Sequence, residues 1–177
     1  MNGEFLGTVE SRAAFALRGL REAWQRFSKV SGDPANEEAA MIALVEALWW
    51  TVSLDEEYGK AFGPLYKTER DADERGRVID GIRLARNRGG HQRALLVEKR
   101  ELTWPIRWPA TFGLFFRWRP VEDLPPADPR YEAREKPLRT AYEMWLSGRP
   151  ADQTVREVLA WFDYAAGRYL GTFVEDA

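Results

Sequence analysis

The spacing of apolar residues is the feature that most restricts the fold of this chain. Apolar side chains recur every three or four positions through long stretches, and charged residues fill the positions between them. This period places the apolar side chains on one face of an α-helix, which then packs against other helices. In the first stretch, residues 4–30, the pattern includes Leu6, Val9, Ala13, Ala16, Leu20, Trp24 and Phe27.

Four further helices are expected after residue 30. The second covers residues 35–60 after an Asp33 cap with Pro34 following it, and the FGP triplet at 62–64 marks a turn. A third helix is expected from Thr68, which would cap it with Asp71 three positions on, and to weaken at Gly89–Gly90. The residues after the glycines, up to about 102, are expected to resume the helix. The last two helices are expected over residues 131–147, ending at Gly148, and over residues 152–170.

Residues 102–130 differ in character from the rest of the chain. Prolines recur there, and aromatic residues alternate with others around Phe112–Trp118. This pattern indicates a short irregular or β-hairpin-like insert followed by a proline-rich loop. We therefore predict a single all-α domain spanning residues 1–177, an antiparallel bundle of about five helices with one small insert.

The composition restricts the possible location of the protein and the kinds of site that it can form. The chain has no cysteine, which excludes a disulfide framework and thiolate metal sites. Its net charge is −2, so a nucleic acid would need a local basic patch rather than a global field. No stretch approaches the roughly 18 consecutive apolar residues of a membrane span, and the first residues lack an apolar leader. We expect a cytoplasmic protein without a membrane partner.

The chemistry-bearing stretch is RNRGGH, residues 86–91, which contains the only histidine. Arg86 offers a permanent charge with a fork of donors that suits phosphate, and Asn87 both donates and accepts. His91 exchanges protons near neutral pH. RNA carries its own nucleophile, the 2′-hydroxyl, so these side chains form a minimal set for cleaving a phosphodiester without a metal or cofactor.

The spacing within this stretch raises a geometric difficulty. Residues five apart on a straight helix are separated by roughly 140°, so Arg86 and His91 would point to different sides. Asn87 and His91, four apart, would share a face. A kink or helix end at Gly89–Gly90 would bring His91 toward Arg86, and we therefore expect the glycines to act as a hinge.

The stretch GIRLARNRGGHQRALL resembles the signature of HEPN domains, a helical ribonuclease superfamily of toxin–antitoxin and phage-defence systems. The hallmark is Arg, four to six residues, then His, often with a polar residue directly after the Arg. The preceding helix, VEALWWTVSLDEEYG, is similar to an acidic, aromatic helix beside that motif. The likeness covers about residues 40–100, and the insert at 102–130 has no counterpart in the family.

The resemblance implies an RNA endonuclease that leaves a 2′,3′-cyclic phosphate, with Arg86, Asn87 and His91 as catalytic residues. It also implies a homodimer whose two motifs face one another, and it suggests an antitoxin protein as a further partner. Transesterification needs one proton removed and another donated, so a dimer with two histidines is chemically reasonable.

Residues around the motif would support the site. Glu46 and Asp55 could orient Arg86 or His91, although an ion pair between helices explains them equally well. Arg83, Arg88 and Arg93 belong to a basic stretch that could bind RNA phosphates. The arginines of the insert lie among tryptophans that could stack on bases, although core or interface packing is the favoured reading: Trp104, Arg107, Trp108, Arg117, Trp118 and Arg119.

Simpler interpretations stay open. His91 could be a solvated histidine without a role, and the arginines could complement the dipole at the end of a helix. A non-catalytic HEPN-like module that binds RNA, a nucleotide or a protein is the main alternative function. A structural dimer that uses the tryptophan-rich insert as its contact surface is the third. No metal site is expected, because one histidine and scattered carboxylates lack ligand spacing.

Overall fold

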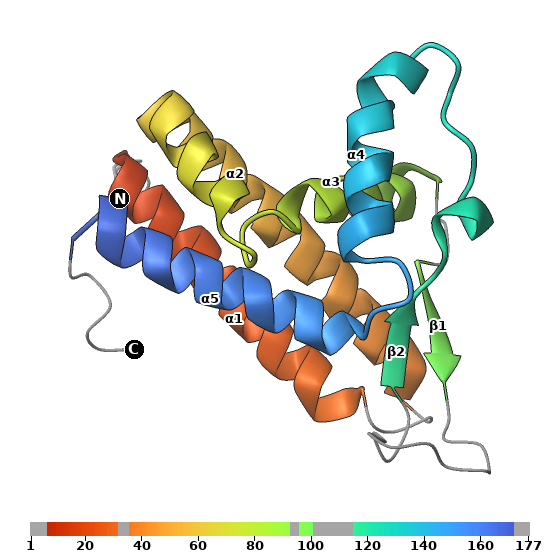
Figure 1. Ribbon diagram of the computed structural model, residues 1–177. Coiled ribbons are helices and arrows are strands. Elements are labelled where there is room, and N and C mark those ends of the chain that lie inside the picture. The colour runs from red at the N-terminus through yellow and green to blue at the C-terminus, as the bar shows by residue number, and fades with distance from the viewer. Residues whose placement is uncertain (1–6, 32–35, 93–95, 101–114, 172–177) are drawn as a thin grey trace.

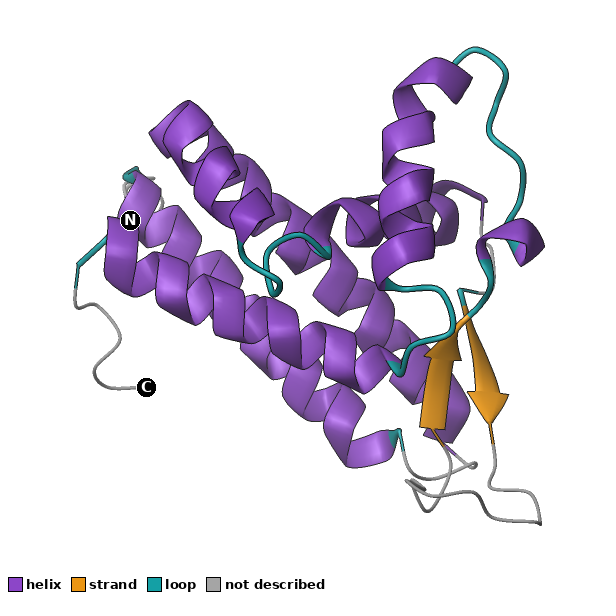
Figure 2. Ribbon diagram, viewed as in Figure 1, coloured by secondary structure: helices purple, strands orange, loops and turns teal. Residues whose placement is uncertain are grey.

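Five helices and a two-stranded sheet form the described part of the chain (Figures 1 and 2). The computed structural model describes residues 7–31, 36–92, 96–100 and 115–171, and it describes only the backbone of residues 90–92, 99–100 and 115. The predicted all-α bundle with a small hairpin is confirmed. The elements are α1 (Val9–Val30), α2 (Glu37–Ala72), α3 (Ile79–Gln92), β1 (Val97–Arg100), β2 (Phe115–Trp118), a 3₁₀ turn η2 (Val121–Asp123), α4 (Glu132–Trp145) and α5 (Ala151–Tyr169).

Helices α1, α2 and α5 form the long part of the bundle. In Figure 1, α1 runs antiparallel to both α2 and α5, and α3 and α4 lie beside one end of this group. The Thr8 hydroxyl caps α1 by accepting a hydrogen bond from the Ser11 backbone N–H at 3.1 Å. The predicted apolar face of α1 is buried at Ala13, Ala16 and Leu20, so its helical spacing was interpreted correctly.

Helix α2 is longer than predicted and contains a kink. Gly63 has φ 57° and ψ −134°, a conformation that glycine tolerates, and Pro64 begins the next helical segment. The FGP turn is thus a kink, and the helix continues to Ala72. The expectation that Thr68 caps a new helix is wrong, because Tyr66 and Arg70 are buried and hold this segment of α2 against the bundle.

The small sheet corrects the prediction for residues 91–102. These residues do not resume a helix, since Val97–Arg100 forms β1 and pairs antiparallel with β2, Val97 opposite Trp118. Alternation explains β2, because Phe116 and Trp118 are buried while Arg117 between them is not. The hairpin predicted inside residues 102–130 is confirmed for β2. Residues 101–114 lie outside the described part of the chain.

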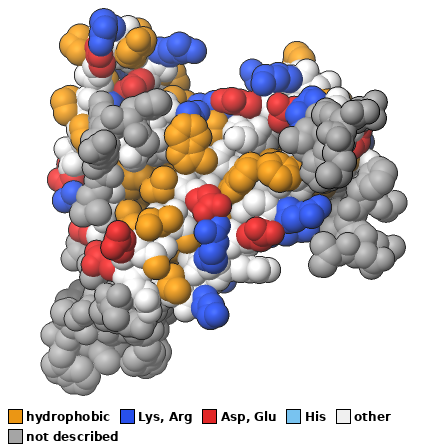
Figure 3. Space-filling view, turned by 180° about the vertical axis from the view of Figure 1, so that it is seen from behind, with side chains coloured by type: hydrophobic (Ala, Val, Ile, Leu, Met, Phe, Trp, Pro, Cys, Tyr) orange, Lys and Arg blue, Asp and Glu red, His pale blue; other side chains and the backbone are white. Residues whose placement is uncertain are grey.

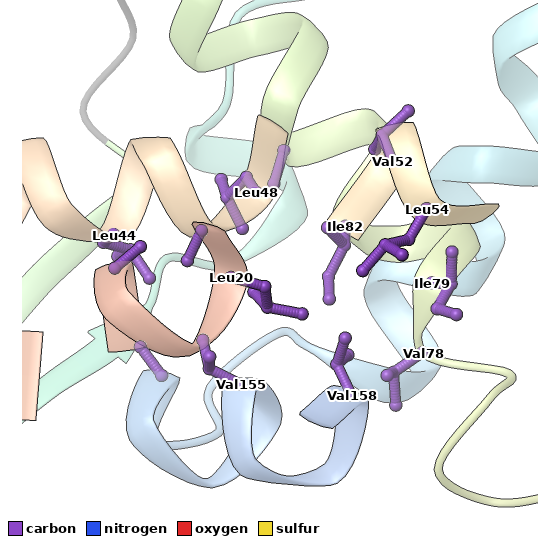
Figure 4. Close-up of a cluster of buried hydrophobic side chains, with 14 of the residues drawn as sticks. Leu20, Leu44, Leu48, Val52, Leu54, Val78, Ile79, Ile82, Val155 and Val158 are labelled. Atoms are coloured by element: carbon purple, nitrogen blue, oxygen red, sulfur yellow. The ribbon is translucent and has the colours of Figure 1, made fainter. Parts of the chain in front are cut away.

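One hydrophobic core joins these elements. Figure 4 shows Leu20 of α1, Leu48 of α2, Ile82 of α3 and Val158 of α5 converging on the same interior. The Trp118 indole N–H donates to the Thr154 hydroxyl at 3.0 Å, which attaches β2 to α5. Within the described residues, no helix is both long enough and apolar enough to cross a bilayer.

Candidate functional site

A polar hollow of about 660 Å³ lies between α3 and the first half of α4. Arg83, Arg86 and Asn87 stand three and four positions apart on α3, so they share the face that lines it. The full lining is Glu56 of α2, Arg83, Arg86, Asn87 and Arg88 of α3, Asp128 and Tyr131 in the turn before α4, and Arg134, Glu135 and Leu138 of α4.

A glycine brings α3 and α4 together at a point outside the lining of this hollow. A Cβ atom at Gly81 would lie 2.7 Å from Leu146 Cδ1 and 3.0 Å from Tyr142 Cα. The helices therefore touch backbone to backbone near the start of α3 and the end of α4. Farther along α3, arginine side chains separate the two helices, and the hollow forms there.

Arg83 is fully engaged with carboxylates. Its Nη2 donates to Asp55 Oδ2 at 2.6 Å, and its Nη1 donates to Glu56 Oε1 at 2.8 Å. Burial disfavours its charge, but the two carboxylates outweigh burial and raise the pKa of Arg83. Its predicted role as an RNA contact stays a prediction, and these bonds would have to open first.

Asp55 is the centre of a closed ionic cluster. Only 6% of its side chain is exposed, and it accepts bonds from Arg70 Nη1 at 3.0 Å and from the Tyr66 hydroxyl at 2.9 Å as well as from Arg83. Among the described residues, no hydrogen bond or ion pair joins Asp55 to Arg86. The structure thus places Asp55 behind Arg83, where it ties both segments of α2 to α3.

Arg88 and Glu135 form the second closed pair. The Arg88 side chain is 2% exposed, and its Nη2 donates to Glu135 Oε2. Arg88 Nε is buried without a hydrogen-bond partner among the described residues. The pair connects α3 to α4, and the predicted contact between Arg88 and RNA stays a prediction that this burial does not favour.

Arg86 differs from both of these arginines. Its guanidinium lies over the Trp49 ring at 4.8 Å and 3.8 Å from Glu56 Oε1, with only 16% of the side chain exposed. Its buried Nε has no hydrogen-bond partner among the described residues. Burial lowers the pKa of Arg86, and the Glu56 carboxylate offsets only part of this effect. Arg86 thus remains a cation whose charge is poorly compensated by the protein.

Asn87 and Arg134 add uncommitted polar groups to the same hollow. Both line it, and neither side chain has a hydrogen bond or an ion pair with any described residue. Together with Arg86 they offer amide and guanidinium donors from two helices. This donor set suits an anion with several oxygens, such as phosphate.

The glycine hinge expected next to His91 is wrong. Helix α3 runs without interruption from Ile79 to Gln92, so it includes Gly89, Gly90 and His91. A Cβ atom at Gly89 would lie 2.8 Å from Leu96 Cδ1, which shows that this glycine makes room for the residue before β1. The position of His91 is one turn beyond Asn87 and about 140° around the helix from Arg86.

Two other predicted groups lie apart from the hollow. Glu46 accepts from Arg26 Nη2 at 2.6 Å, so it joins α2 to α1, and it does not line the hollow. Trp118 is fully buried in the core, which confirms the favoured packing interpretation for this member of the aromatic cluster. Trp104, Trp108 and the predicted RNA contact Arg93 lie outside the described residues.

Sequence reasoning missed three side chains that shape the site. The first is Trp49, whose ring lies under the Arg86 guanidinium although nothing in the local sequence marks it as part of a site. Tyr131 and Arg134 stand more than 40 positions after the motif, and nothing in their local pattern links them to it. The local pattern shows Arg134 as one of several polar residues in the first turn of the fourth helix, and nothing in that pattern distinguishes it from the others.

The face in Figure 3 shows hydrophobic, basic and acidic side chains interspersed, with no continuous basic surface. Within the described residues, no three His, Cys, Asp or Glu side chains gather as a metal site would need. Comparisons with protein families, curated proteins and solved structures found no match to this chain.

Proposed function

We propose that this chain is an RNA endonuclease of HEPN type and that the hollow between α3 and α4 binds the scissile phosphate. The observation that carries the proposal is Arg86, a half-buried guanidinium whose buried Nε has no partner among the described residues and whose pKa is lowered by desolvation. A phosphate oxygen beside it would supply the missing acceptor and the missing charge. Asn87 and Arg134 provide further donors in the same hollow.

The proposed chemistry is a transesterification within the RNA. The 2′-oxygen forms a bond to phosphorus, the bond from phosphorus to the 5′-oxygen breaks, and a 2′,3′-cyclic phosphate remains. One imidazole takes the 2′-hydroxyl proton, and a protonated imidazole gives a proton to the departing 5′-oxygen. Arg86 stabilises the charge on the phosphorane oxygens, and Asn87 positions the phosphate. No metal ion enters these steps.

A homodimer would resolve the separation between Arg86 and His91. On the unbroken α3 these positions lie about 140° apart, which disfavours joint action within one chain. Two copies related by a two-fold axis would present two arginines and two histidines to one groove. Arg86 of one copy would then act with His91 of the other.

The alternative is a non-catalytic module that binds RNA, a nucleotide or a protein. The unbroken α3 is the observation that favours it, because no bend in the helix brings the histidine position toward Arg86. The carboxylates of Glu56 and Glu135 in the hollow also limit how many phosphates it could hold.

Cleavage assays test the first proposal. Purified protein is incubated with total RNA or tRNA in EDTA, alongside His91→Ala, Arg86→Ala and the control Arg156→Ala, whose exposed side chain pairs with Asp152 on α5. We expect products with 2′,3′-cyclic ends from the wild type and the control, and losses of about 100-fold or more from the other two. RNA binding without cleavage would support the alternative, and neither binding nor cleavage would overturn both.

Mixing the two inactive variants tests the shared site. Random exchange of subunits would give mixed dimers in half of the population, each with one intact pair of Arg86 and His91. Activity should then return in part, to below about one quarter of the wild-type level, because each mixed dimer keeps one imidazole where the wild type has two. A mixture that stays inactive, although subunits with two different affinity tags co-purify as exchanged dimers, would contradict the pairing of Arg86 with His91 across the two chains.

A further inference from the structure

Tyr131 is a large aromatic side chain at the mouth of the hollow. It lines the hollow together with Arg86, Asn87 and Arg134, and 51% of the residue is exposed. An exposed tyrosine alone needs no explanation, since apolar surface is common in folded proteins. Tyr131 is distinguished by its position beside Asn87 and Arg134, whose side chains could donate hydrogen bonds to a phosphate.

The turn before α4 fixes the position of this ring. The Tyr131 backbone N–H donates to the Asp128 carbonyl at 2.8 Å. The Asp128 carboxylate accepts from Arg130 Nη2 at 2.6 Å and from Arg130 Nε at 3.1 Å, which holds that guanidinium 5.7 Å from the Tyr131 ring centroid. The backbone of Tyr131 is therefore held by the turn, and a cation already lies near the ring.

Trp49 differs from Tyr131 because it contacts Arg86 directly. The Arg86 guanidinium lies over the Trp49 ring, 4.8 Å from its centroid, so Trp49 positions a hydrogen-bond donor that could bind phosphate. Among the described residues, Tyr131 contacts Arg130 and Asp128, and no cation–π contact joins it to Arg86. A nucleotide whose phosphate lies on Arg86, Asn87 and Arg134 could therefore place its base on Tyr131.

We propose that Tyr131 is a stacking subsite for an unpaired nucleobase next to the phosphate bound at Arg86. This inference rests on the phosphate site of the proposed function. A base inside a duplex is already stacked on both faces, so the subsite selects single-stranded over double-stranded RNA. Stacking needs only an aromatic face and is therefore tolerant of base identity.

The chain offers a matched control in Tyr164 of α5. It is 44% exposed, and the Arg75 guanidinium lies 5.5 Å from its ring centroid. Tyr164 thus has nearly the exposure and the cation contact of Tyr131 but does not line the hollow. A loss specific to Tyr131 would come from its place beside the phosphate donors.

Fluorescence anisotropy tests the subsite without relying on cleavage. The probe is a labelled ten-nucleotide 2′-O-methyl RNA, which lacks the attacking hydroxyl, used as a single strand and as a duplex. We expect tighter binding of the single strand, a loss of roughly 5- to 100-fold in Tyr131→Ala, and near wild-type affinity in Tyr131→Phe and Tyr164→Ala. Equal melting temperatures would show that the variants are folded.

The outcomes separate this inference from the proposed function. Unchanged affinity in Tyr131→Ala, or equal affinity for both probes, overturns the stacking subsite. If Arg86→Ala still weakens binding in that case, the phosphate site stands without it. A wild-type protein that binds neither probe overturns the phosphate site and the subsite together.

Discussion

Helix α3 presents two groups of arginines, and they differ in how well the protein satisfies them. Arg83 and Arg88 donate to buried or half-buried carboxylates, Asp55 and Glu135. Arg86, between them in the sequence, has an aromatic ring, one distant carboxylate and a buried Nε without a partner. Closed pairs hold the helices together, whereas an unsatisfied cation is what a binding site for an anion requires.

The largest expected effect comes from breaking the closed cluster. Asp55→Ala would remove the buried carboxylate that Arg70 and Arg83 share, and only the more exposed carboxylates of Asp71, Asp80 and Glu56 would remain beside these arginines. We expect the free energy of unfolding in urea to fall by about 3–5 kcal/mol. Glu56→Gln is the control, because Glu56 is 46% exposed and should cost less than about 1 kcal/mol. Equal losses in the two variants would contradict a special role for Asp55.

The second closed pair should show a smaller effect. Glu135→Gln leaves the buried Arg88 guanidinium with a neutral acceptor, and we expect a loss of about 2–3 kcal/mol in urea unfolding. Arg134→Gln, from the same turn of α4, should change stability by less than about 0.5 kcal/mol. The comparison fails if Arg134→Gln destabilises the protein as much as Glu135→Gln.

The close approach of α3 and α4 can be tested at Gly81. An added methyl group would meet Leu146 and the Tyr142 backbone, so Gly81→Ala should cost about 1–3 kcal/mol and alter RNA binding as α4 moves. Gly167→Ala on α5 is the control, because nothing lies within 4 Å of the added atom. This variant should stabilise the protein by up to about 1 kcal/mol. Calorimetry that ranks the two variants in the opposite order would contradict the packing argument.

The smallest expected effect is on the salt dependence of RNA affinity. Arg134→Gln should reduce the slope of log affinity against log salt by about 0.7, the contribution of one phosphate contact on a single strand. Arg83→Gln should leave the slope unchanged, because Asp55 and Glu56 already engage this guanidinium. A larger slope change in Arg83→Gln would show that the closed cluster opens to RNA.

Local pattern was enough to predict much of the fold. The three- and four-residue spacing predicted α1, α4 and α5 to within a few residues, and the alternation of Phe116 and Trp118 indicated a strand. The local pattern failed where tertiary contacts determine how far a helix extends. Buried Tyr66 and Arg70 hold the part of α2 past its kink, and Gly89, which packs against Leu96, lies inside an α3 that continues to Gln92 where a hinge was expected.

The sequence by itself determined which residues can supply the chemistry: an arginine, an asparagine and the single histidine on one amphipathic helix. Only the tertiary structure decided which arginines are paired with carboxylates of the protein and which can bind an anion. Asp55 stands 28 positions before Arg83, and Glu135 stands 47 positions after Arg88, so neither pairing is written in a local pattern. Helix packing brings those carboxylates to Arg83 and Arg88. It leaves Arg86, which lines the hollow, over Trp49 with a buried Nε that has no partner among the described residues.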